Sequence, residues 1–224
     1  VKEQIAIQKE ALRNKKTARK YIAYFQAYTN TYAPADYLER IFTEAIEDPE
    51  VVILSIATRP DCLPEDVLDL LARLNQQKPV WVELGLQTMH EESAQIIHRG
   101  YDLACFERAV SELRSREIDV IVHTILGLPG EGKEEVLQTI DYLNHMDIQG
   151  IKLQLLHILK GTQLGQIYLE QKEGQEFISP MTMEAYIDLV IDCVEHLSPE
   201  ITIHRLTGDG PKELLLAPMW STRK

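Results

Sequence analysis

Segments with the pattern of buried strands alternate with segments with the pattern of helices along nearly the whole chain. Strands are expected at 21–26, 51–56, 80–86, 119–125, 151–156 and 201–205. Helices are expected at 1–17, 35–46, 64–74, 91–97, 103–116, 133–146 and 182–196, and residues 158–181 have the pattern of a loop with one short helix. This alternation is typical of βα units and of a mainly parallel sheet, so the sequence predicts an α/β fold.

The strand expected at 80–86 has a second property. Every second side chain, at Val82, Leu84 and Leu86, is apolar. In the alternating set, Glu83 and, just beyond the strand, Gln87 are polar. A strand that is covered by a helix on one face shows polar residues on its other face only where that face lines a wet cavity. The sequence therefore predicts part of a barrel with a hydrated lumen. The first helix is expected to place Ile5 and Leu12 on one apolar face.

Composition limits the possible functions. The 224 residues suffice for one large domain or two small ones, and no apolar run approaches the ~18 residues of a membrane span. The net charge of −12 counts against strong nucleic-acid binding by these residues alone. The three cysteines, Cys62, Cys105 and Cys193, are far apart, which indicates reduced thiols in a cytoplasmic protein and no zinc or cluster site within the chain. Neither end resembles a natural terminus, which favours a fragment of a longer protein, although a domain that starts with a helix is the alternative.

Polar residues follow the expected strands, at the edge where parallel α/β proteins place their chemistry. For each of them a plainer interpretation stays open. Gln26 could cap its loop, Arg59 could pair with Asp61 on the surface, and His123 could be a buried structural histidine. The segment 127–131 could be an ordinary turn that starts a helix.

Four of these stretches resemble one known family. They are AYFQAYTNTY at 23–32, SIATRPD at 55–61, ELGLQT at 83–88 and ILGLPGE at 125–131. In this order, on successive strand ends, they resemble the radical S-adenosylmethionine enzymes over nearly the whole chain. The likeness is greatest to the YhcC/YtqA-like group, which is related to the catalytic subunit of elongator.

The resemblance implies a partial (β/α)6 barrel of the TIM type with mainly parallel strands. It also implies S-adenosylmethionine beside a [4Fe–4S] cluster, held by three cysteines in a loop after the first strand, and an electron donor. That strand and its cysteine loop are absent from this sequence. Residues 1–205 are therefore expected to be the barrel core without its first strand, and 206–224 the start of a C-terminal extension. As given, the chain is expected neither to bind the cluster nor to catalyse, and the activity belongs to the parent protein.

The resemblance assigns the methionine end of the cofactor to four positions. Gln26 and Tyr28 lie where relatives contact the methionine amine. Gln87 lies at the strand position that reaches the methionine moiety. Arg99 has the spacing of an arginine that binds the methionine carboxylate, for which a guanidinium is well shaped.

Five further positions correspond to other parts of the cofactor site. Ser55 and Thr58 match a ligand-binding region of their strand, and His123 matches a position near the ribose. Gly127 begins a turn that passes the adenine, which His157 also approaches. No catalytic residue and no metal ligand is assigned within the chain.

The substrate is open between three hypotheses. The first is tRNA, modified at the side chain of a wobble uridine, and it depends on analogy with elongator. The second is the same radical chemistry on a small metabolite or a protein. The third is a non-catalytic barrel that binds a nucleotide or a partner.

Overall fold

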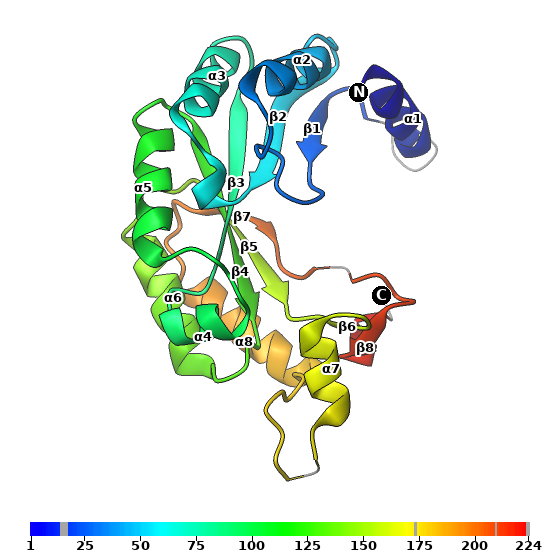
Figure 1. Ribbon diagram of the computed structural model, residues 1–224, viewed down its shortest axis with the longest axis vertical. Coiled ribbons are helices and arrows are strands. Elements are labelled where there is room, and N and C mark those ends of the chain that lie inside the picture. The colour runs from blue at the N-terminus through cyan, green and yellow to red at the C-terminus, as the bar shows by residue number, and fades with distance from the viewer. Residues whose placement is uncertain (14–17, 173, 209, 223–224) are drawn as a thin grey trace. The chain divides into compact units, whose positions relative to one another are not determined.

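The computed structural model describes residues 1–13, 18–172, 174–208 and 210–222 (Figure 1). The helices are α1 (Lys2–Arg13), α2 (Ala35–Ile46), α3 (Glu65–Asn75), α4 (Glu91–Ile96), α5 (Leu103–Arg114), α6 (Lys133–Asn144), α7 (Gln163–Glu170) and α8 (Met183–His196). The strands are β1 (Tyr21–Phe25), β2 (Val51–Thr58), β3 (Val80–Gln87), β4 (Asp119–Leu126), β5 (Gly150–Leu155), β6 (Ile158–Leu159), β7 (Thr202–Arg205) and β8 (Leu215–Ala217). Two short 3-10 helices cover Pro60–Cys62 and Met219–Thr222.

Six strands form one sheet in the order β1-β2-β3-β4-β5-β7. The pairs β1/β2, β2/β3 and β5/β7 are parallel, with Phe25 opposite Ile56 and Ile56 opposite Val82. Neighbouring strands of this sheet follow one another along the chain, with β6 left out, because the helices between them return the chain to the end at which each strand begins. The α/β fold class expected from the alternation is confirmed.

The expected boundaries are close to the observed ones. Helix α2 has the bounds that the sequence predicts, and β2 runs two residues further than expected. The first helix is described to Arg13, and the remainder of its expected range, 14–17, lies outside the described residues. The sequence did not predict the small antiparallel sheet of β6 and β8, whose strands are too short to show a period.

The chain divides into two compact units. Unit 1 comprises residues 1–85 and 104–121, and unit 2 comprises residues 86–103 and 122–224. Each is described by itself below. The proposed division at residue 205 stays a prediction, and β8 beyond it pairs with β6 before it.

The core of unit 1 is formed where α2 packs on β2 and on α3. Leu38 and Phe42 of α2, Leu54 and Ile56 of β2, and Leu70 of α3 are all fully buried. The helix residues recur at spacings of three and four, and this places them on the face toward the strands. Burial of each such side chain contributes on the order of 1.5–3 kcal/mol.

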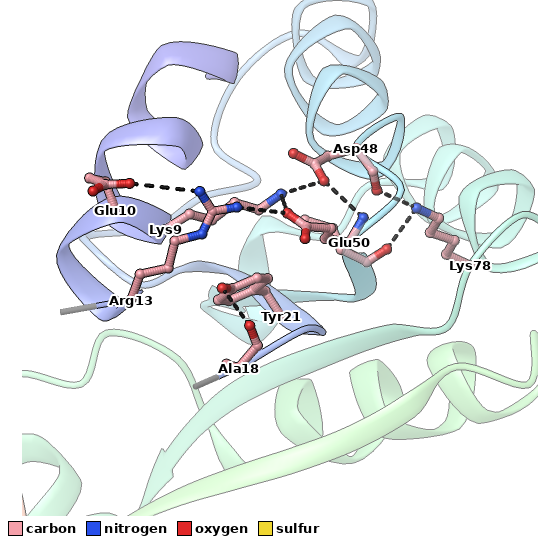
Figure 2. A network of polar contacts seen from close by, with 9 residues as sticks. Lys9, Glu10, Arg13, Ala18, Tyr21, Asp48, Glu50 and Lys78 are labelled. Atoms are coloured by element: carbon pink, nitrogen blue, oxygen red, sulfur yellow. Dashed lines mark hydrogen bonds and ion pairs between the residues drawn. The ribbon is translucent and has the colours of Figure 1, made fainter. Parts of the chain in front are cut away.

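Helix α1 packs on the rest of unit 1 differently from the prediction. Leu12 is exposed, and the buried residue of the helix is Lys9, which is 8% exposed. The Lys9 ammonium binds the carboxylates of Asp48 and Glu50 and lies 5.3 Å from the centre of the Tyr21 ring (Figure 2). Lys78 donates to the carbonyl of Asp48 at 2.7 Å. Ion pairs therefore help to hold the helix, and of the expected apolar face Ile5 is half-buried whereas Leu12 is not covered.

In unit 2, α6 and α8 pack side by side (Figure 1). Ile140 and Leu143 of α6 and Leu189 and Cys193 of α8 are buried. A smaller cluster of Ile158, Ile178 and Ala217 stabilises the two-stranded sheet. None of the described helices combines the length and apolarity that a membrane crossing requires.

Candidate functional site

The loop after β1 is tied to the carboxyl end of β2. The side-chain amide of Asn30 donates to the carbonyls of Phe25 at 3.0 Å and Ala57 at 2.8 Å. This double contact ties the end of the loop to both strands. Gln26 and Tyr28 lie in that loop, and the Tyr28 side chain is 98% exposed. Both side chains are therefore accessible to a ligand.

Tyr28 also has a left-handed backbone conformation. Its φ is 63°, a region that non-glycine residues other than Asn and Asp adopt at a cost. Such outliers persist where surrounding structure imposes them, and they cluster at functional sites. The left-handed backbone of Tyr28 is consistent with the expectation that this loop binds a ligand, which stays a prediction.

Ser55 belongs to a buried polar group. Its hydroxyl donates to Glu83 Oε1 at 2.7 Å, and the hydroxyl of Tyr24 donates to Glu83 Oε2 at 2.8 Å. Glu83 is 3% exposed. The expectation that this carboxylate faces a wet cavity is wrong, because neighbouring side chains enclose it and satisfy its oxygens. The Ser55 hydroxyl is occupied by this contact.

Thr58 lies at the end of β2 and is also buried. Its hydroxyl contacts that of Thr31, which in turn donates to the carbonyl of Cys62. The next residue, Arg59, forms a bidentate pair with Asp61, with nitrogen–oxygen distances of 2.9 and 2.7 Å. The Arg59 guanidinium lowers the pKa of the Asp61 carboxyl. The structure therefore contains the ion pair with Asp61 that the plainer interpretation of Arg59 predicted.

In unit 2, Gln87 ends β3 with a φ of 68°. Its side chain is half-buried, and its amide has no hydrogen-bond partner among the residues that the structure describes. The left-handed backbone turns the chain away at the carboxyl end of the strand, where parallel folds bind ligands. Gln87 therefore offers a donor and an acceptor to a ligand.

Arg99 is buried, with 6% of its surface exposed, and its guanidinium is largely occupied. It donates to the carbonyls of Thr88 at 2.8 Å, Leu86 at 3.3 Å and Tyr101 at 2.9 Å, and to Glu91 Oε1 at 2.7 Å. Four of its five N–H groups are thus used within unit 2. These contacts favour a role in fixing the segment after Gln87. The proposed contact with a carboxylate stays a prediction.

His123 is half-buried on β4. The amide of Gln154 on β5 donates to its Nδ1 at 3.0 Å, which places the proton of a neutral ring on Nε2. The sequence analysis missed Gln154. The signal was present, because Lys152 and Gln154 form a polar alternation on β5 like that on β3.

Gly127 follows β4 with a φ of 86°. A side chain there would lie 3.1 Å from both Cγ and Sδ of Met181. The loop from Gly127 to Lys133 lines a cavity of about 560 Å³ together with Phe177, Met181 and Asp188. In this loop the buried Oε1 of Glu131 has no hydrogen-bond partner among the described residues.

Glu131 and Gln87 are related through a second, narrower pocket of unit 2. Both line it, together with Thr124 of β4. Glu131 was not assigned a role from the sequence, although it ends the ILGLPGE stretch. A buried carboxylate oxygen without a donor is costly, so it indicates a partner that protein atoms do not supply.

His157 follows β5 and packs against two glycines. A side chain on Gly210 would lie 3.0 Å from His157 Cδ2, and one on Gly208 would lie 3.8 Å from Cε1. The absence of a side chain at Gly210 thus leaves room for the ring, whereas the distance at Gly208 is an ordinary van der Waals contact. Asp209, between them, lies outside the described residues.

The residues of this chain do not suit an iron–sulfur cluster. Within the described ranges no group of three or more His, Cys, Asp or Glu side chains is arranged to hold a metal ion, and the three cysteines are free thiols. Burial raises the pKa of the Cys193 thiol to about 12, and burial also raises that of Cys62. Cluster ligands are thiolates, so these two cysteines are poor ligands at neutral pH.

Two family descriptions match the chain. Residues 1–143 match the Radical SAM superfamily, and residues 148–224 match the Radical_SAM C-terminal domain. The chain is 48% identical over 92% of its length to the uncharacterized protein YtqA of Bacillus subtilis (strain 168). It is 39% identical over 91% of its length to the protein YhcC of Escherichia coli (strain K12). These matches cover 62% and 64% of the two relatives, so the chain spans less than two thirds of their length.

A more distant relative has a stated activity. The tRNA uridine(34) acetyltransferase of Methanocaldococcus jannaschii is 24% identical over 74% of this chain and 30% of that protein. Among solved structures, the archaeal Methanocaldococcus infernus Elp3 with an N-terminal deletion (1-46) has a TM-score of 0.78 at 18% identity, over 94% of this chain and 53% of that one. This likeness confirms the expected fold class, an α/β fold of the partial (β/α)6 barrel type with parallel strands. On the strength of the family match over residues 1–143 and of the close relatives, the chain belongs to the radical SAM superfamily.

Proposed function

We propose that this chain is the S-adenosylmethionine-binding core of a radical SAM enzyme. The observation that carries the proposal is Gln87. It combines a left-handed backbone at the carboxyl end of β3 with a half-buried amide that has no partner in the described part of the chain. An amide at this place can donate to and accept from the amino and carboxylate groups of the methionine moiety.

Other residues would bind the remainder of the nucleoside. In unit 2, His123 carries its proton on Nε2 when neutral and can donate to a ribose hydroxyl. The turn at Gly127 lets the backbone approach an adenine, and the His157 ring offers a flat face for stacking. In unit 1, Gln26 and Tyr28 are exposed, and their contact with the amine stays a prediction, whereas the hydroxyls of Ser55 and Thr58 are engaged with protein atoms.

The cluster must be held by residues outside these 224, since the three cysteines here do not suit it. When bound, a [4Fe–4S] cluster supplies the electron that cleaves the sulfonium and yields a 5′-deoxyadenosyl radical. In that reaction the residues of this chain would bind and orient the nucleoside and exclude water from it. The free thiols of the chain fit a reducing, cytoplasmic compartment, where an electron donor is available.

A direct test is calorimetric titration of the chain with S-adenosylmethionine and with S-adenosylhomocysteine. Gln87→Ala is expected to weaken binding about tenfold, the cost of a lost hydrogen bond in a partly buried site. Gln95→Ala is the matched control, because Gln95 is exposed on α4 in the same unit. Equal affinities of wild type and Gln87→Ala would remove Gln87 from the site. Absence of saturable binding of both nucleosides by the wild-type chain would refute the proposal that these residues hold the cofactor.

For the substrate we propose a tRNA uridine at the wobble position. Support comes from the distant tRNA uridine(34) acetyltransferase relative and from the shared Elp3 fold. The net charge of −12 opposes direct binding of RNA by these residues, so RNA affinity would come from elsewhere in the protein. Comparison of the modified nucleosides in tRNA from cells with and without the gene tests the proposal. Unchanged tRNA would leave a small metabolite or a protein as the substrate of the same radical chemistry.

A further inference from the structure

Helix α8 carries an apolar stripe that the residues described by the structure leave exposed. Met183, Ile187, Ile191 and Val194 are spaced four, four and three residues apart, which places them in one row along the helix. Their side chains are 44%, 48%, 51% and 41% exposed. Single exposed apolar residues are common, but a continuous row of three turns is typical of an interaction surface.

The stripe is additional to the face that packs on unit 2. That face consists of Tyr186, Leu189 and Cys193, which are buried. A surface helix of a globular protein needs only one apolar face. Packing in the core of unit 2 therefore does not account for the exposed stripe as a second apolar face.

An acidic row runs beside the stripe. Glu184, Asp188, Asp192 and Glu195 each follow a member of the stripe by one residue. Asp192 pairs with Lys133 at 2.7 Å, whereas the other three have no cationic partner within the described residues. An apolar seam with charges along one side has the pattern by which helices select helical partners.

We propose that this face of α8 binds a basic amphipathic helix of a partner protein. The apolar residues of such a helix would cover the stripe, and its lysines or arginines would lie against Glu184, Asp188 and Glu195. A second copy of this chain fits poorly, because α8 contains no lysine or arginine and pairing two copies would bring the acidic rows together. An anionic membrane surface would repel the acidic row in the same way.

The test uses a fluorescent amphipathic peptide of leucine and lysine, about 18 residues long so that it forms a helix. Fluorescence anisotropy should show saturable binding to the wild-type chain and no binding of a peptide of the same composition in scrambled order. The variant I187S/I191S should bind the peptide at least about tenfold more weakly. The variant E184Q/D188Q/E195Q should bind more weakly with a smaller salt dependence. The control E134Q/D141Q/E170Q removes the same number of charges from other exposed parts of unit 2 and should bind like the wild type.

Three outcomes would overturn the proposal. The first is equal peptide binding by wild type and I187S/I191S, or equal binding of the scrambled peptide. The second is a wild-type dimer in light scattering that I187S/I191S converts to a monomer, which would assign the stripe to a second copy. The third is stripe-dependent binding to vesicles of phosphatidylcholine and phosphatidylglycerol. Circular dichroism checks that every variant is folded, which is expected because every altered side chain is exposed and the half-buried Asp192 is left unchanged.

Discussion

The hydroxyl of Ser55 on β2 donates to the carboxylate of Glu83 on the neighbouring strand β3, over 2.7 Å. The second carboxylate oxygen accepts from Tyr24 of β1, so one acid connects three adjacent strands of unit 1. Burial of a carboxylate is costly unless hydrogen bonds compensate it. The two hydroxyls therefore help to keep Glu83 within the sheet.

Removal of either hydroxyl should destabilise unit 1. Ser55→Ala and Tyr24→Phe each leave one oxygen of Glu83 with a donor fewer, and a loss of about 1–3 kcal/mol in the free energy of unfolding is expected for each. Because both changes act on one carboxylate, their effects should not be additive. Urea denaturation measures this, with Ser111→Ala on the exposed side of α5 as a control that changes stability by less than about 0.5 kcal/mol. Two variants as stable as the control would show that the bonds contribute nothing.

Lys9 should be the residue that fixes α1. Lys9→Met leaves Asp48 and Glu50 without their cation and should lower the free energy of unfolding by about 1–3 kcal/mol. Lys2→Met on the same helix removes an exposed pair with Glu47 and should lower the free energy of unfolding by clearly less than Lys9→Met does. Chemical denaturation of both variants at neutral pH measures the difference. Equal effects would mean that burial of Lys9 adds nothing to its ion pairs.

The contribution of Lys9 should depend on pH in a defined direction. The hydrogen bond from Lys9 lowers the pKa of Asp48 despite partial burial. A lowered pKa in the folded state gives stability that is present above the unfolded pKa of ~3.9 and is lost as pH falls through the folded value. Burial lowers the pKa of Lys9, but the bonds to Asp48 and Glu50 outweigh it and raise the pKa. Its contribution is therefore full below the unfolded pKa of ~10.4 and is lost as pH rises through the folded value. The difference between wild type and Lys9→Met should be largest between these limits, and a difference that persists unchanged at pH 2 would contradict this.

The sequence predicted the elements well where a local pattern specifies them. Helix α2 was predicted to the residue because its apolar positions recur at helical spacing after Pro34. The sequence analysis did not predict that Lys9 and Arg99 are buried, because no local pattern of the sequence indicates the burial of a charged side chain. The acceptors of Arg99 are mainly backbone carbonyls, which every residue carries, so only the folded chain shows which of them meet. The β6–β8 pairing is likewise non-local, and two- and three-residue strands have no period to detect.

Arg99→Ala should destabilise unit 2 by about 2–4 kcal/mol, because it leaves three carbonyls and Glu91 without a buried charged donor. Arg108→Ala, at an exposed position of α5, is the control and should change stability by less than about 0.5 kcal/mol. Thermal unfolding measures both. The proposed carboxylate contact makes a different prediction: Arg99→Lys should stay folded and lose affinity for S-adenosylmethionine. Equal stability of the Arg99→Ala and Arg108→Ala proteins would show that the contacts of Arg99 do not stabilise the segment after Gln87.

Two causes of strain, the left-handed backbone and a contact with Met181, can be told apart by comparing substitutions at Gly127 and Gly130 in the turn after β4. Their φ angles are 86° and 84°, so an alanine at either position is expected to cost about 1–2 kcal/mol for a left-handed backbone. A side chain at Gly130 meets nothing within 4 Å, whereas one at Gly127 meets Met181 at 3.1 Å. Gly127→Ala should therefore destabilise more than Gly130→Ala, and the added substitution Met181→Ala should remove that excess while it adds its own packing loss. A double-mutant cycle with urea denaturation measures the coupling free energy between each glycine substitution and Met181→Ala. Gly127→Ala with Met181→Ala should be less destabilising than the sum of the two single substitutions, whereas Gly130→Ala with Met181→Ala should equal that sum. Equal couplings would show that the contact with Met181 does not limit residue 127, and that backbone conformation alone requires the glycine.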